Sequence, residues 1–180
     1  MAQQFKVEDG TGLTGANAYC NVAYLRQYWD NFGYDYSTIS ESQLMTYIIR
    51  SSHIVDSRYR SFFPGTKLLD AQAREWPRED SYYPVDKIEI SSSIVPEEIK
   101  NAVCEMAFAL NGGTDLQPVN TSSDATYERD VVDVIETERR YDNGRKSTTV
   151  DRVTAVDDAL SRFTGGIPGA YNLKIIRVGG

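Results

Sequence analysis

Residues 40–59 read SESQLMTYIIRSSHIVDSRY, and this stretch indicates most clearly what kind of fold the chain adopts. Ser40 and Gln43 have the spacing of a capping box, in which each side chain bonds a free backbone amide of the first helical turn. Apolar residues then recur at helical spacing, at Leu44, Ile48, Val55 and Tyr59. Pro64 and Gly65 end the segment. The stretch therefore predicts an amphipathic helix.

Similar signals predict one helix before this stretch and one after it. Asn21 is placed to cap a helix over residues 22–32 that ends near Gly33. Pro96, followed by two glutamates, marks the start of another helix, which Gly112 and Gly113 end. The apolar stripes are Val22, Leu25, Tyr28 and Trp29 in the earlier helix, and Ile99, Val103, Met106 and Leu110 in the later one. A further short helix is predicted over 68–76, stopped by Pro77.

The composition changes after Gly113. Residues 114–125 are rich in turn formers and read as a linker. Residues 127–141 contain β-branched side chains and precede Asp142-Asn143-Gly144, a hairpin turn signal, so 145–153 are expected to return as the second strand.

A short helix over 155–163 and an extended tail complete the chain. The fold class expected is mainly α: a small helical bundle with a β-hairpin insertion and an extended C-terminal arm. Its parts are a helical body over 1–113, a polar linker and β-hairpin over 114–153, and a short helix with the arm over 154–180.

The charge of the chain bears on its partners. It has 19 basic and 26 acidic residues, a formal net charge of −7. Double-stranded DNA is bound mainly by lysines and arginines that neutralise phosphates, so the chain as a whole is poorly suited to that role. The densest basic groups are Arg58 and Arg60, then Arg74 and Arg78, then Arg139, Arg140, Arg145 and Lys146. Acids are interleaved with each group, which indicates solvated faces.

No combination of residues in the sequence indicates catalysis. Cys20 and Cys104 lie far apart and match no metal or redox spacing, so we expect both to be buried thiols in a reducing compartment. His53 is the single histidine and has no evident partner for acid–base work. The glycine-rich GTGLTG lacks the lysine of a phosphate-binding loop. We expect no enzyme, no cofactor and no metal site.

The termini and the hydropathy predict a protein outside membranes. The N-terminal MAQQFKVEDGTG has no apolar core of a secretory signal. No apolar run approaches the length of about 18 residues that a membrane span needs.

The aromatic residues allow two interpretations. Twelve tyrosines, six phenylalanines and two tryptophans could stack on the bases of single-stranded nucleic acid. Such proteins pair stacking rings with a basic groove, which the acidic balance disfavours. Core packing is the simpler explanation for the rings on helix stripes, namely Tyr28, Trp29, Tyr47 and Tyr59.

The stretch QAREWPR, at 72–78, has three possible roles. Trp76, Pro77 and Arg78 can anchor the loop to its own subunit, contact another subunit, or offer the tryptophan ring to a base. Because tryptophan is usually buried, anchoring within the chain is favoured.

Four ordered segments resemble a family of small tailed-phage proteins. VEDGTGLTGANAYCNVAYLRQYW is similar to the family's opening, and IVDSRYRSFFPGTK with AQAREWPR resembles its central segment and W-P-R tripeptide. IVPEEIKNAVCEMAFAL resembles its next helix, and AVDDALSRF with LKIIRVGG its C-terminal helix and tail. The family is often labelled DnaT-like single-stranded-DNA-binding, and its members look like head–tail connector proteins.

The resemblance implies a head–tail adaptor in the neck of the virion, made in the host cytoplasm. Its partners would be the portal protein, a tail or second connector protein, and further copies in a dodecameric ring through which double-stranded DNA passes without specific binding. The arm that docks on the portal would contain Leu173, Ile175, Ile176, Arg177 and Val178. The alternatives are a single-stranded-DNA-binding accessory protein of replication and a structural protein elsewhere in the virion neck or tail.

Overall fold

The computed structural model describes residues 4–113 and 153–164, together with the backbone of four short strands between them. The chain is mainly helical and carries an antiparallel hairpin, as the sequence predicts. Its contacts divide it into two units, one formed by Met1–Gly113 with Val153–Gly180 and the other by Thr114–Arg152. The short helix after the hairpin therefore belongs to the same unit as the N-terminal body.

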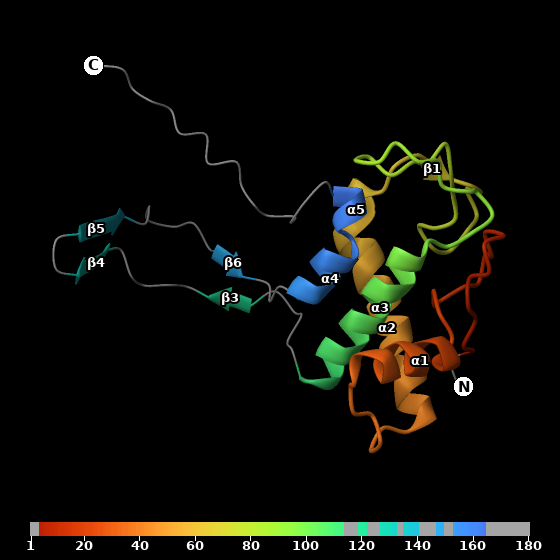
Figure 1. Cartoon of the computed structure of the whole chain (residues 1–180), viewed down its shortest axis with the longest axis horizontal. Helices are drawn as coiled ribbons and strands as arrows, with labels where there is room; N and C mark the ends of the chain where they lie inside the picture. The colour runs from red at the N-terminus through yellow and green to blue at the C-terminus, as the bar shows by residue number, and fades with distance from the viewer. Residues whose placement is uncertain are drawn as a thin grey trace. The chain divides into compact units, whose positions relative to one another are not determined.

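The first unit is a bundle of helices centred on α3 (Figure 1). Helix α3 packs against α2 and α4, and α1 packs against both α2 and α3. Ile99, Val103 and Met106 of α3 are fully buried. The helices are α1 (Val22–Phe32), α2 (Glu41–Tyr59), the 3-10 turn η1 (Arg60–Phe62), α3 (Glu97–Asn111), α4 (Thr154–Ala159) and α5 (Ser161–Thr164).

The predicted caps set the helix boundaries. Asn21 accepts a hydrogen bond from the Tyr24 amide at 2.8 Å, and Gly33 ends α1 with a φ of 70°, in the left-handed region that glycine tolerates. Ser40 and Gln43 form the expected capping box at the start of α2. These predictions are confirmed, because local hydrogen bonding decides where a helix begins and ends.

The helix predicted over 68–76 is absent, and that prediction is wrong. This segment forms turns between the two-residue strands β1 (Thr66–Lys67) and β2 (Arg78–Glu79), which pair antiparallel. Gln72 provides the reason. Its Oε1 accepts from the Leu69 amide at 2.9 Å, and its Nε2 donates to the Pro77 carbonyl at 2.9 Å. The buried Gln72 side chain thus joins the two ends of the segment and holds it in turns.

The second unit contains two antiparallel strand pairs. Strand β3 (Val119–Thr121) pairs with β6 (Ser147–Thr149), and β4 (Tyr127–Val132) pairs with β5 (Ile135–Arg140). A hairpin is present, but its turn follows Val132 rather than falling at 142–144 as predicted. The observed register places Glu128 opposite Arg139 and Arg129 opposite Glu138.

An aromatic cluster joins α5 to the loop after η1. The ring of Phe163, only 3% exposed, lies 5.8 Å from Phe63, 5.4 Å from Trp76 and 5.3 Å from Tyr83, measured between ring centroids. The helix predicted over 155–163 is present as α4 and α5, interrupted at Leu160. Within the described part of the chain, no helix has the length and apolar character to cross a bilayer.

Candidate functional site

The QAREWPR loop packs within its own chain. The Trp76 side chain has no exposed surface, and Pro77 is buried beside it through a cis peptide bond. Arg78 donates to the carbonyls of Pro64 and Gly65, each at 2.7 Å, and pairs with Glu75 at 3.1 Å. A ring with no exposed surface cannot stack on a base in this conformation.

Tyr19 and Asp56 hold this loop against α2. The Tyr19 hydroxyl donates to Asp56 Oδ1 at 2.5 Å and accepts from the amides of Glu75 and Trp76, at 2.9 and 3.1 Å. Arg74 lies 3.3 Å from Asp56 Oδ2. Burial, the largest cause, raises the pKa of Asp56 from 3.8 to about 6, against the opposing effects of Tyr19 and Arg74. These hydrogen bonds fasten the loop to α2, and their groups are engaged with one another, so we assign the network a structural role.

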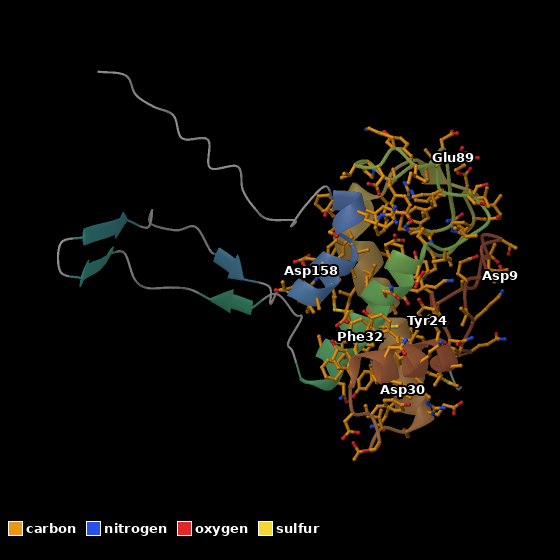
Figure 2. The ribbon with its side chains drawn as sticks, viewed as in Figure 1. Asp9, Tyr24, Asp30, Phe32, Glu89 and Asp158 are labelled. Carbon is orange, nitrogen blue, oxygen red and sulfur yellow. The ribbon has the colours of Figure 1, made fainter. Side chains whose placement is uncertain are left out.

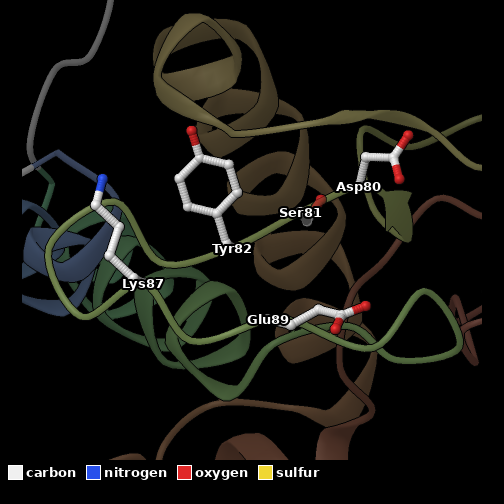
Figure 3. Close-up of a pocket in the computed structure, with 5 residues that line it drawn as sticks. All are labelled: Asp80, Ser81, Tyr82, Lys87 and Glu89. Carbon is white, nitrogen blue, oxygen red and sulfur yellow. The ribbon is translucent and has the colours of Figure 1, made fainter.

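A surface pocket lies on the loop that follows β2 (Figure 3). Its lining residues are Asp80, Ser81, Tyr82, Lys87 and Glu89. The Lys87 ammonium lies 5.4 Å from the centre of the Tyr82 ring. Two carboxylates against one ammonium make this pocket unfavourable for a phosphate.

A basic face is formed by the solvent side of α2 and by η1. Arg50, His53, Ser57 and Arg60 are all exposed and follow one another at helical spacing. Phe62, with 43% of its surface exposed, follows two positions after Arg60. We call this set of five residues the basic helix face.

None of the five residues of the basic helix face is acidic. Asp56 is the single acid between residues 42 and 62, and its carboxylate is turned toward Tyr19 and Arg74. Among the described residues, neither Arg50 nor Arg60 forms an ion pair. Their guanidinium groups are therefore available to an anion.

The rings of the two helix stripes differ in burial. Trp29 and Tyr59 are buried as predicted, whereas Tyr28 and Tyr47 are half-exposed. Tyr28 donates to the buried carboxylate of Glu105 at 2.8 Å, and Tyr34 donates to its other oxygen at 3.2 Å. Burial, and then the hydrogen bond to Glu105, raise the pKa of Tyr28. Figure 2 shows the neighbouring Tyr24 and Phe32 on α1.

The cysteines are both buried and free, as expected. Burial, followed by a hydrogen bond with Cys20, raises the pKa of the Cys104 thiol, so the two side chains lie together although they are distant in sequence. Among the residues that the structure describes, no group of histidine, cysteine and acidic side chains is arranged to hold a metal ion.

A protein family matches nearly the whole chain, over residues 3–178. It is described as "Putative DnaT-like ssDNA binding protein". The chain belongs to this family. Neither a curated protein nor a solved structure matches the chain.

Membership of the DnaT-like family corrects the description of the chain as a virion head–tail connector. The matched family is described by single-stranded DNA binding, and nothing in the comparisons supports a connector, a portal-binding protein or a ring in the virion neck. The expected location in the virion and the expected portal and tail partners were implied by the resemblance to connector proteins. No comparison tests them, and they stay predictions. The proposed portal-binding residues Leu173, Ile175, Ile176, Arg177 and Val178 lie outside the described residues.

The basic helix face of this DnaT-like protein was missed in the sequence because its charges are spread over three turns. A search for clustered basic residues finds Arg58 and Arg60 but not Arg50. The signal that could have found the face is the spacing of Arg50, His53, Ser57 and Arg60 on a helix already predicted. The buried role of Glu105 had a weaker signal, a single acid in the apolar run AVCEMAFAL.

Proposed function

We propose that the protein binds single-stranded DNA through the basic helix face. The observation that carries this proposal is the exposed row of Arg50, His53 and Arg60, which has no acid on it and is followed two positions later by the exposed ring of Phe62. Proteins that bind single strands combine cationic groups for the backbone with rings on which bases stack. The family description supports the same function.

The dimensions of the face suit a short tract of DNA. Arg50 and Phe62 are twelve positions apart, about 18 Å along a helix, which is long enough for several nucleotides. The arginines would contact phosphates, and Phe62 would stack on an unpaired base. Contacts to phosphates and stacking on a ring do not depend on which base is present, so binding should be insensitive to base sequence. Stacking needs an unpaired base, so a single strand should bind better than a duplex.

The net charge of −7 limits the affinity. Two exposed arginines attract phosphates locally, while the acidic remainder of the chain repels the DNA at longer range. We therefore expect weak binding, with a dissociation constant on the order of 10 µM at low salt.

The test is a titration of a fluorescein-labelled oligothymidylate, followed by fluorescence anisotropy at about 50 mM salt. Replacing both arginines, Arg50→Ala with Arg60→Ala, should weaken binding about tenfold, because two phosphate contacts are lost. The matched control is Lys87→Ala with Lys100→Ala, which removes the same charge away from the face. Equal losses in the two double variants, or no binding by the wild type, would overturn the proposal.

A further inference from the structure

His53 lies between the two arginines of the basic helix face. It follows Arg50 by three positions and precedes Ser57 by four, so these exposed side chains are neighbours on the surface of α2. Arg60 caps the helix with helical backbone angles, φ −51° and ψ −32°, so the row reaches it without a break. At 3.6 residues per turn, the four positions fall within about 80° of the helix circumference.

The two arginines leave a gap along the face. They are ten positions apart, about 15 Å along the helix. Successive phosphates along one strand of B-form DNA are separated by only about 3.4 Å along its axis, so a bound strand places further phosphates between the arginines. Ser57 lies in this gap, but its hydroxyl donates to the Ile54 carbonyl at 3.0 Å. His53 is then the donor that the row offers between its two arginines.

The His53 side chain is available to a ligand. Within the part of the chain that the structure describes, it takes part in no hydrogen bond, ion pair or ring contact. A neutral imidazole donates through one nitrogen, whereas an imidazolium donates through both and carries a positive charge. Histidine is also the side chain whose charge ordinarily changes between about pH 5 and pH 8. The face therefore carries two permanent cations and, between them, one group whose charge depends on pH.

Charged groups from several elements lie around this part of α2. On the helix itself, Arg50 and Asp56 lie three positions to either side of His53. The groups that approach from other elements are Tyr19, Arg74 and Glu75, together with Arg60 at the start of η1. Asp56 pairs with Arg74 rather than with the imidazole. The pKa of Asp56 is raised to about 6, chiefly by burial, so its charge changes in the same pH range and a test must separate the two groups.

We propose that protonated His53 contacts a phosphate of the bound strand, so that the protein binds single-stranded DNA more tightly below neutral pH. This inference rests on the proposed function and adds a third, pH-dependent cation to the same site. In the free protein the two arginines oppose a further positive charge between them, and a bound phosphate offsets that repulsion. Because linkage is reciprocal, a strand that binds the protonated form more tightly also favours protonation of the imidazole.

The test measures oligothymidylate affinity by fluorescence anisotropy at about pH 6 and about pH 8, at equal ionic strength and with a label whose fluorescence does not depend on pH. We expect the wild type to bind about threefold more tightly at the lower pH, because one phosphate contact is added. His53→Gln, which stays neutral, should lose this dependence on pH. His53→Lys, which stays charged, should bind tightly at both pH values. Asp56→Asn is the matched control, since it removes the other titrating group and should keep the dependence.

A second measurement uses the fact that His53 is the single histidine of the chain. Its ring protons give isolated resonances in a proton NMR spectrum, and their chemical shifts follow the protonation of this one side chain. The pH midpoint of that titration should rise when saturating oligothymidylate is added.

Three outcomes would overturn the role of His53 and leave the proposed function intact. They are the same dependence on pH in His53→Gln as in the wild type, a dependence that Asp56→Asn abolishes, and a histidine midpoint that DNA does not change. The absence of binding by the wild type at both pH values would instead overturn the proposed function, and this inference with it. The two failures are therefore distinguished in one set of titrations.

Discussion

Glu8 is a carboxylate at 3% exposure that organises the glycine-rich segment before α1. Its Oε1 accepts from the amides of Gly10 and Gly12 at 3.0 and 2.9 Å, and its Oε2 accepts from the Leu13 amide at 2.9 Å. Gly10 itself must be a glycine. Its φ is 99°, and a Cβ there would lie 2.1 Å from the Ser93 carbonyl oxygen. One side chain thus satisfies three backbone donors in a loop that no helix or strand supports.

Replacing this carboxylate should destabilise the fold. Glu8→Ala leaves three backbone amides without their acceptor, so we expect the free energy of unfolding to fall by about 3 kcal/mol. Urea denaturation measures this change. Glu8→Gln keeps one acceptor oxygen and should lose less. A loss below about 0.5 kcal/mol in the alanine variant would show that water replaces the carboxylate.

Asp56 makes stability depend on pH. Its pKa in the fold is raised from 3.8 to about 6, chiefly by burial, so the folded chain binds this proton more tightly than the unfolded chain does. The resulting stabilisation is complete below pH 3.8 and is lost as the pH rises through 6. We expect the unfolding free energy of the wild type, relative to Asp56→Asn, to fall by about 2 kcal/mol between about pH 4 and pH 7.

The measurement is urea denaturation of both proteins at the two pH values. The variant keeps an oxygen that can accept from Tyr19, which limits other differences between them. A difference that rises with pH would show that the ion pair with Arg74 outweighs burial.

At the scale of the elements, α5 is a single helical turn that contributes one aromatic ring, that of Phe163, to the core. Phe163 contacts Phe63, Trp76 and Tyr83, which belong to a segment far from it in sequence. Arg162 adds a cation 3.6 Å from the centre of the Tyr83 ring and pairs with Glu98 of α3. The helix after the insertion thereby closes the aromatic core of the first unit.

Phe163→Ala should therefore destabilise the first unit by about 4 kcal/mol, since it removes a buried ring and leaves a cavity. Thermal unfolding followed by circular dichroism measures the loss. Ser161→Ala, on the exposed side of the same turn, is the control and should leave the midpoint nearly unchanged. Equal midpoints for Phe163→Ala and the wild type would show that α5 is not part of the core.

The elements that the sequence predicts correctly are those defined by local rules. Capping residues and apolar spacing gave α1, α2 and α3, because the determinants of these helices lie within the helices. The helix predicted over 68–76 was wrong because the buried Gln72 side chain joins the two ends of this segment and holds it in turns, which apolar spacing does not reveal. The predicted position of the hairpin turn was wrong because strand pairing depends on which residues face each other. The turn signal at Asp142-Asn143-Gly144 carries no information about those residues.

The candidate site was predictable in part. From the sequence, single-strand binding was the alternative and not the main hypothesis. The net negative charge of the whole chain argued against DNA binding, although one helix carries an exposed row of basic residues. The contacts of Glu105 with Tyr28 and Tyr34 join residues more than 70 positions apart, and no local pattern reveals them.

At the scale of the whole molecule, the chain is a helical unit interrupted by an insertion. Residues 114–152 form their own unit, whereas α4 and α5 pack with the segment before the insertion. The basic helix face belongs to the first unit. Folding and binding by that unit should therefore be independent of the insertion.

Replacing residues 114–152 with a glycine–serine linker tests this independence. We expect the midpoint of thermal unfolding to change by less than about 4 °C, because the core of the first unit keeps all its contacts. Oligothymidylate affinity should stay the same. Loss of the cooperative transition would show that the insertion is part of the fold. Loss of DNA binding with the fold intact would place the DNA site in the insertion.

The central claim is that Arg50 and Arg60 contact phosphates, and the salt dependence of oligothymidylate binding tests it most directly. Each phosphate contact on a single strand contributes about −0.7 to the slope of log affinity against log salt concentration. The slope should therefore be shallower by about 1.4 in the variant that combines Arg50→Ala with Arg60→Ala. An unchanged slope in that variant, or the absence of oligonucleotide binding by the wild type at low salt, would contradict the account.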